Sequence, residues 1–159
     1  MKTIKYTLSA LIIVAIAFFT ACDGGGGGDD PQPSEEDLMK EKLSKTWNIS
    51  SVTLSNEDVT ADFSGFTLTL QSSGSYSTNS SSVERSPNPW PNSGSVEFGG
   101  SADSPNLNQL VRDDGLTMSV STDGSSLSLS FTFSDEHTDS TGGRVEIVNG
   151  SWVFQFTAQ

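Results

Sequence analysis

Residues 127–133 read Leu-Ser-Leu-Ser-Phe-Thr-Phe, with an apolar side chain at every second position. Because successive side chains of a strand point to opposite faces, this period of two predicts a β-strand with one buried and one wet face. The same alternation recurs at residues 66–71, 116–121 and 152–157. Four such segments predict an all-β domain.

Shorter stretches suggest further strands. The weaker candidates are residues 46–54, 75–79, 94–99, 106–112 and 144–148. In the first of these, the apolar phase changes between Ile49 and Val52, which predicts a β-bulge near Ser50-Ser51. Short strands at this spacing are typical of a β-sandwich or a β-barrel.

The connections between these segments are short and rich in turn residues. Asp123-Gly124 lies between two alternating strands, which is the signature of a tight hairpin. No helical stretch of ten residues interrupts the strands, so we expect an antiparallel sheet. Two segments break the rhythm, residues 56–64 and 80–93, and the second contains Pro89-Trp90-Pro91.

A short helix is expected just before the first strand. Ser34 can act as the N-cap, and Asp37 stands three residues later in the position of a capping box. Acidic residues in the first turn and lysines further on both suit the helix dipole. We expect this helix to pack as a lid on one end of the domain.

The first 22 residues have the features of an export signal. Lys2 and Lys5 precede an apolar run of about a dozen residues, too short for a convincing membrane span of about 20 residues. The string Phe19-Thr20-Ala21-Cys22 resembles the lipobox of bacterial lipoproteins, in which the cysteine is acylated and becomes the new N-terminus. This resemblance implies a signal peptide at 1–21, a lipidated Cys22 (palmitate being one possible acyl group) with a Gly/Asp/Pro tether at 22–34, and a domain at 35–159.

Composition excludes several classes of function. The chain has 8 basic and 20 acidic residues and a formal charge of −12, whereas nucleic-acid binding needs clustered basic residues. The single cysteine excludes an internal disulfide, and one histidine, His137, is too few for zinc sites built on several Cys or His ligands. The acidic run around it, residues 135–139, is interpreted as a solvated hairpin tip. We expect no cofactor, no metal, no catalytic residue and no enzymatic activity.

Several strings along residues 36–159 resemble one protein family. These are Leu43-Ser44-Lys45-Thr46-Trp47, Ser64-Gly65-Phe66-Thr67-Leu68, Pro89-Trp90-Pro91, Arg112-Asp113-Asp114-Gly115 and Leu127-Ser128-Leu129-Ser130-Phe131. In this order they resemble small lipocalin-like lipoproteins of Bacteroidetes, although Lys45 stands where lipocalins have glycine. The resemblance implies an antiparallel up-and-down β-barrel of eight or so strands with a short N-terminal helix. Members of that family mostly lack an assigned activity.

The expected barrel interior is apolar and rich in aromatic residues, with no acidic or basic side chain clearly pointing inward. It is either a packed core or a pocket for a hydrophobic solute. Trp90 is either an exposed ring that stacks on a ligand or a plug that seals one barrel end. If a ligand binds, the candidate residues are Trp47, Tyr76, Trp90, Phe98 and Trp152.

Taken together, these features predict an outer-membrane lipoprotein, held to the membrane by its lipid anchor and exposed at the cell surface. The acidic residues after Cys22 resemble the surface-export signals of Bacteroidetes lipoproteins. The expected function is a non-enzymatic binding or accessory module for a small hydrophobic solute or a glycan. The alternative is a structural or protein-interaction module of the cell envelope with a filled barrel.

Overall fold

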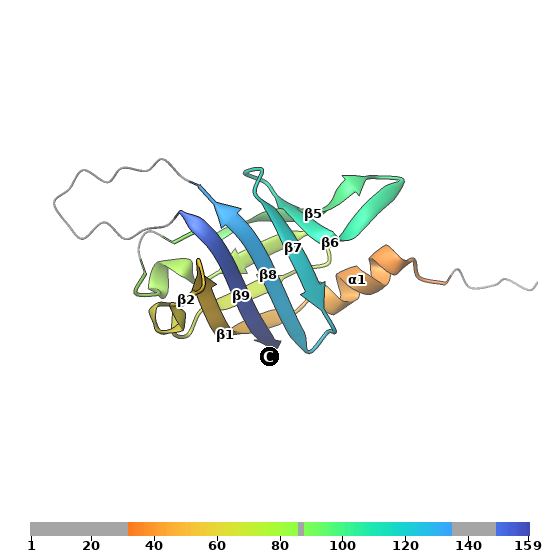
Figure 1. Cartoon of the computed structure of the whole chain (residues 1–159). Coiled ribbons are helices and arrows are strands. Elements are labelled where there is room, and N and C mark those ends of the chain that lie inside the picture. The colour runs from red at the N-terminus through yellow and green to blue at the C-terminus, as the bar shows by residue number, and fades with distance from the viewer. Residues whose placement is uncertain (1–31, 86–87, 135–148) are drawn as a thin grey trace, which may run out of the picture. The chain divides into compact units, whose positions relative to one another are not determined.

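A computed structural model describes residues 32–85, 88–134 and 149–159. The domain begins with a short helix, and the rest is almost entirely β-structure (Figure 1). The elements are α1 (Glu35–Leu43), β1 (Thr46–Leu54), β2 (Glu57–Asp58), the 3-10 helix η1 (Thr60–Phe63), β3 (Thr67–Leu70), β4 (Ser75–Thr78), the 3-10 helix η2 (Ser80–Ser82), β5 (Ser93–Ser101), β6 (Ser104–Arg112), β7 (Thr117–Thr122), β8 (Ser126–Phe133) and β9 (Gly150–Ala158).

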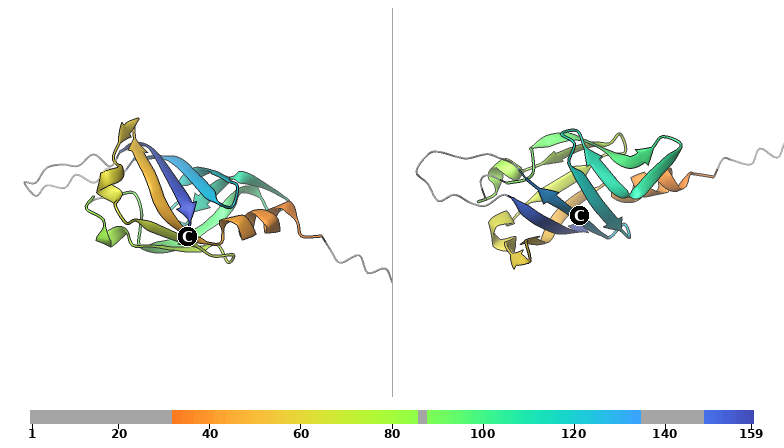
Figure 2. Two further views of the ribbon diagram at one scale, coloured as in Figure 1. Left: turned by 90° about the horizontal axis from the view of Figure 1, so that it is seen from below. Right: turned by 45° about the horizontal axis from the view of Figure 1, so that its top comes forward.

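The strands form one antiparallel sheet that closes on itself. Their order is β2-β1-β3-β4-β5-β6-β7-β8-β9, and β1 also pairs with β9 along most of its length. Eight strands therefore make the closed up-and-down barrel, and the short β2 is added beside the far end of β1 (Figure 2). This confirms the predicted all-β, lipocalin-like barrel with one short N-terminal helix. The expected strand at 144–148 lies outside the described residues.

The predicted bulge in β1 is present. The register of β1 against β9 shifts between Ile49 and Ser51. One extra residue changes which face the following side chains occupy, so Trp47 and Val52 are both fully buried although they are five positions apart. The bulge is what allows a single nine-residue strand to line the interior at both ends.

Helix α1 begins where the sequence predicted. The amide of Asp37 donates to Oγ of Ser34 over 3.1 Å, and the amide of Ser34 donates back to the Asp37 carboxylate. The two bonds complete the capping box. The Ser34 hydroxyl also donates to the Asp37 carboxylate over 2.7 Å, and this bond, together with the one from the Ser34 amide, lowers the pKa of Asp37. At the other end of α1, the Trp47 indole N–H donates to the carbonyl of Leu43 over 2.9 Å. This bond ties the helix to one end of the barrel, as expected for a lid.

The barrel interior is filled by aromatic side chains. Phe154 of β9 lies at the centre, with six other rings at centroid distances of 5.2 to 6.2 Å. Contacts of this kind add about 0.5–1.5 kcal/mol per pair to the stabilisation from buried area. The partners come from η1, the segment before β3, the loop before β5, β8 and β9 itself: Phe63, Phe66, Trp90, Phe131, Trp152 and Phe156. The interior is therefore a packed core.

Replacing the central ring tests this packing. We expect Phe154→Ala to lower the free energy of unfolding by about 3–5 kcal/mol, because the cavity it leaves cannot collapse among rigid rings. Gln155→Ala, at the adjacent exposed position of the same strand, is the control, with an expected change within about 0.5 kcal/mol. Urea unfolding of both variants measures the difference, and equal losses would contradict the packed interior.

Hydrogen bonds in the β7–β8 turn stabilise the ionised form of Asp123. Oδ1 of Asp123 accepts hydrogen bonds from the amides of Ser125 and Ser126 and from the Ser126 hydroxyl. These bonds lower the pKa of Asp123 to about 2, and Gly124 takes the positive φ of 90° that the turn requires. The hairpin predicted from Asp123-Gly124 is confirmed.

This contact predicts a pH dependence of stability. Because the pKa of Asp123 is lower in the folded than in the unfolded chain, its contribution is complete above pH about 4 and is lost as the pH falls towards 2. We expect Asp123→Asn to flatten the decline of the unfolding free energy over this range. Asp103→Asn, in the β5–β6 turn, is the charge-matched control. A decline in Asp123→Asn as steep as in the unmodified chain would contradict the assignment.

Candidate functional site

The five residues predicted to bind a ligand do not form one open site. Trp47 and Trp152 have no exposed surface, and Tyr76 and Trp90 are 3% and 4% exposed. These four belong to the packed core of the barrel. Phe98 of β5 is half-buried and lies away from them, beside helix α1. Only Phe98 therefore stands where an external molecule can reach it without displacing the core.

Trp90 is the plug of the barrel. It comes from the long loop between η2 and β5, and its ring lies 5.8 to 6.3 Å from those of Phe66, Tyr76, Phe131 and Phe154. The loop around it is held by hydrogen bonds from the Trp90 amide to Asn88 Oδ1 and from the Thr78 hydroxyl to the Pro91 carbonyl. Of the two interpretations of this loop, the structure supports the sealing plug.

Arg112, at the end of β6, locks the plug in place. Its Nη1 donates to the Pro89 carbonyl over 2.8 Å, and its Nε and Nη2 form a fork with the carboxylate of Asp114. The guanidinium also lies over the ring of Trp90 at 5.6 Å. The bond from Arg112 lowers the pKa of Asp114. Arg112 is 2% exposed, so the expectation that no basic side chain points inward was wrong.

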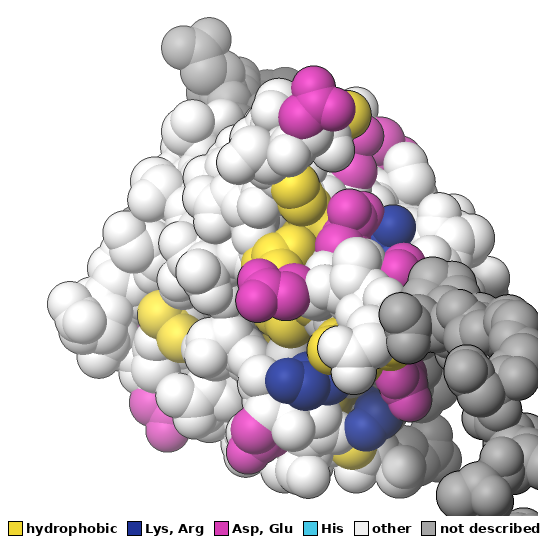
Figure 3. Space-filling view, turned by 90° about the vertical axis from the view of Figure 1, so that its right-hand side faces the viewer, with side chains coloured by type: hydrophobic (Ala, Val, Ile, Leu, Met, Phe, Trp, Pro, Cys, Tyr) yellow, Lys and Arg dark blue, Asp and Glu magenta, His cyan; other side chains and the backbone are white. Residues whose placement is uncertain are grey.

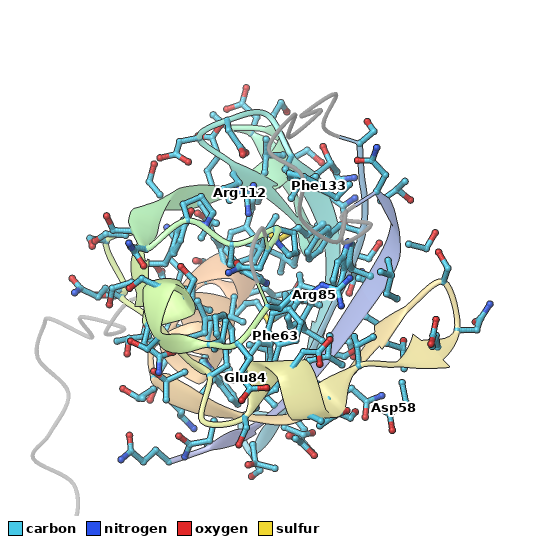
Figure 4. All side chains as sticks on the ribbon, turned by 90° about the vertical axis from the view of Figure 1, so that its left-hand side faces the viewer. Asp58, Phe63, Glu84, Arg85, Arg112 and Phe133 are labelled. Atoms are coloured by element: carbon cyan, nitrogen blue, oxygen red, sulfur yellow. The ribbon has the colours of Figure 1, made fainter. Side chains whose placement is uncertain are left out.

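A second arginine corrects the same expectation. Arg85 follows η2 and is 7% exposed, with its guanidinium 5.2 Å from the ring of Trp152. Its Nη1 donates to the carboxylate of Asp62 in η1 over 2.8 Å. Figure 4 looks onto this end of the barrel and shows Arg85, Arg112 and Phe63 within the ring of strands, with Asp58 at its edge. The end opposite α1 is thus closed by rings and by cations that lie against them.

Two polar atoms in this core have no hydrogen-bond partner among the described residues, the hydroxyl of Tyr76 and the indole nitrogen of Trp90. Burial raises the pKa of Tyr76 to about 12, against the opposing effect of the Arg112 charge. The Tyr76 ring lies across Gly94, where an added Cβ would be 2.7 Å from the hydroxyl oxygen. The tight fit means that Tyr76 serves the packing of β4 against β5.

An apolar cleft lies at the α1 end of the barrel. It is a cleft of about 190 Å³ between α1, the β3–β4 turn and the start of the β5–β6 hairpin. Its apolar residues are Leu43, Leu70, Val96, Phe98 and Leu110. Figure 3, a view onto this end, shows apolar side chains between acidic and basic ones. Sequence reasoning singled out Phe98 but missed the cleft, because it depends on how far β5 extends past β4.

Charged side chains stand at the rim of this cleft. Lys40 and Glu36, one helical turn apart on α1, form an ion pair of 2.7 Å, which raises the pKa of Lys40. Glu97 of β5 is exposed on the other side. The cleft can therefore take up an apolar side chain or two beneath a polar rim. Its volume is below the roughly 300 Å³ at which pockets for small-molecule ligands usually begin.

The remaining predicted groups fall outside the description or form no cluster. Cys22 and the run 135–139 with His137 lie outside the described residues. Within residues 32–85, 88–134 and 149–159, no three His, Cys, Asp or Glu side chains come together as a metal site requires. In the same ranges, no helix has the length and hydrophobicity needed to cross a lipid bilayer.

In comparisons with protein-family models, curated proteins and solved structures, nothing matches the chain.

The role of Arg112 can be tested by substitution. We expect Arg112→Met to lower the free energy of unfolding by about 1.5–3 kcal/mol, because it removes the charge-assisted bonds to Asp114 and to the Pro89 carbonyl. Lys42→Met, which removes an exposed cation of α1, is the control. Urea unfolding at neutral pH compares the two. Equal stability of the two variants would show that Arg112 does not hold the plug.

Proposed function

We propose that the chain is a lipid-anchored outer-membrane protein, exposed at the cell surface, whose filled barrel is a non-enzymatic protein-interaction module. The observation that carries this proposal is the aromatic packing around Phe154, which leaves the barrel interior to side chains. A barrel of eight strands either is filled or holds one small ligand, and here the plug residue Trp90 completes the filling. A partner would then bind to the outer surface of the barrel.

The packing of the interior argues against binding of a hydrophobic solute and against binding of a glycan. A hydrophobic solute inside the barrel would have to displace Trp90, which contacts four rings and Arg112. A glycan that stacks on tryptophan needs an exposed ring, and Trp47, Trp90 and Trp152 are all buried. The cleft at the α1 end is open but small. It suits side chains of a partner protein better than an entire solute.

The non-enzymatic part of the proposal rests on how the buried charges are used. Arg112 and Arg85 are the buried basic groups of the described chain, and their partners are Asp114 and Asp62 at the plugged end. Their cations lie over Trp90 and Trp152, so both contribute to closing the barrel. Both arginines have a structural role. To take part in catalysis, they would have to break their contacts with Asp114, Asp62 and the two tryptophan rings.

The membrane anchor and the family are supported by the sequence. The small residues before Cys22 resemble a lipobox, and the domain strings resemble lipocalin-like lipoproteins of Bacteroidetes. Helix α1 begins at Glu35, so about a dozen residues separate its first turn from Cys22. A tether of Gly, Asp and Pro residues of that length lets the module meet partners while its anchor stays in the membrane.

Native mass spectrometry of the full lipoprotein, extracted from its own membrane in detergent, tests this function. We expect a chain that begins at an acylated Cys22, carries a protein partner and carries no stoichiometric solute. Cys22→Ala should remain unacylated and leave the membrane fraction, while Ser34→Ala, in the same segment, should stay anchored. A small molecule bound at one per chain would contradict the interaction module.

A further inference from the structure

Strand β5 extends well past the strand beside it. The β4–β5 pairing runs from Ser77↔Ser93 to Ser75↔Ser95, and the last bond between them joins the Val96 amide to the Gly74 carbonyl over 2.8 Å. Beyond this point β5 continues to Ser101. Among the described residues, no strand pairs with β5 on that side after Val96.

The backbone of Phe98 faces this vacant position. In an antiparallel strand, the amides of alternate residues point to the same side. The Val96 amide points towards β4, and Val96 and Phe98 keep the same alternation against β6, where they pair with Arg112 and Leu110. The N–H and C=O of Phe98 therefore point into the space next to β5 where β4 would lie if it were longer. The register shift follows only after Phe98.

That space is the cleft at the α1 end. It is bounded by the β3–β4 turn, by Val96 to Phe98 of β5, and by Glu36, Lys40 and Leu43 of α1 on the far side. A strand laid beside β5 would bond to Phe98 and place alternate side chains over Leu43 and Leu110. Proteins that bind a peptide as an added strand use two kinds of contact. Main-chain hydrogen bonds supply affinity, and a neighbouring pocket that accepts alternate side chains supplies specificity.

The opposite edge of the same hairpin is protected. β6 pairs with β7 only over Gln109–Val111, so its first half also lacks a neighbour on that side in the described structure. That half carries Pro105, which has no amide to donate, and an irregular register against β5. Between Val96 and Phe98, β5 has neither proline nor bulge. The unprotected edge is thus the one that borders the apolar cleft.

The acidic residues around the cleft favour a basic partner. The first turn of α1 carries Glu35, Glu36 and Asp37, and Glu97 stands at the cleft on β5. Lys40 is already paired with Glu36. A second copy of this chain, with its formal charge of −12, would bring like charges to this edge. A basic partner would gain attraction there instead.

We propose that the cleft beside β5 binds an extended segment of a partner protein, apolar at alternate positions and flanked by Lys or Arg, as an added β-strand. The proposal rests on the interaction function and names the surface and the partner class. The segment bonds to the backbone of Phe98, inserts one side chain between Leu43 and Phe98, and places its basic ends near Glu97 and the start of α1.

The test uses the capped peptide Lys-Thr-Val-Thr-Val-Lys as the probe and ¹⁵N-labelled full-length lipoprotein in detergent. We expect saturable shifts of the amides of Gly74, Phe98 and Leu43, with slowed hydrogen exchange at Phe98. Versions of the peptide N-methylated at a single residue probe the main chain. Methylation of a peptide residue whose amide points towards β5 should weaken binding about tenfold, because that amide donates to β5. Methylation of a neighbouring residue, whose amide points away from β5, should have little effect.

Two charge reversals provide the matched comparison. Glu97→Lys changes an exposed residue at the cleft, and Glu57→Lys makes the same change in β2, at the other end of the barrel. We expect Glu97→Lys to weaken the peptide about threefold to fivefold at low ionic strength and Glu57→Lys to leave it nearly unchanged. Both sites are exposed, so neither change should disturb folding.

Three results would overturn strand addition at this cleft. They are no binding at millimolar peptide, equal effects of Glu97→Lys and Glu57→Lys, and indifference to N-methylation in both registers. A partner protein found in the native assembly together with any of these results would leave the interaction function in place and move its surface elsewhere. A solute found in the barrel would instead remove the function itself.

Discussion

The position of Phe154 constrains the rest of this domain. Six rings surround it, and they come from five separate parts of the chain. Because interiors of this kind are as dense as organic crystals, each ring restricts the others. Trp90 has to enter from its loop, Phe63 has to enter from η1, and Arg112 has to reach the Pro89 carbonyl to hold the loop. The filled interior and the closed end opposite α1 therefore both follow from the packing of rings around Phe154.

Once the interior is occupied, the two ends of the barrel differ in what they offer (Figure 1). The plugged end uses its cations on rings and on the carboxylates Asp62 and Asp114. At the other end, α1 is tied to the barrel through Leu43 and Trp47, and β5 extends beyond β4. At this end the unpaired edge of β5 borders the apolar cleft. The barrel therefore has one closed end and one end with an apolar cleft, and the proposed interaction function uses the second.

Much of this fold could be predicted from residue patterns with a local cause. The alternation at 127–133, the Ser34 capping box, the phase change after Ile49 and the Asp123-Gly124 turn all appear in the structure. Arg112 could not be predicted to lie inside, because its direction depends on the β5–β6 register, which no local pattern sets. The cleft was missed for the same reason: it arises from unequal strand lengths. Tyr76 and Trp90 were predicted as candidate ligand-binding residues and lie in the core instead, because the alternation alone cannot distinguish a core from a pocket.

Methionine methyl NMR offers the most direct test of the filled barrel. Apart from Met1 the chain has two methionines, Met118 inside the barrel at 1% exposure and Met39 on α1, half-buried. The ¹³C-methyl-labelled protein is titrated with myristate, a hydrophobic solute. A filled interior predicts that the Met118 signal stays fixed throughout the titration, whatever Met39 does. A saturable shift of Met118 would contradict the account, because the solute would then have entered among the rings around Phe154.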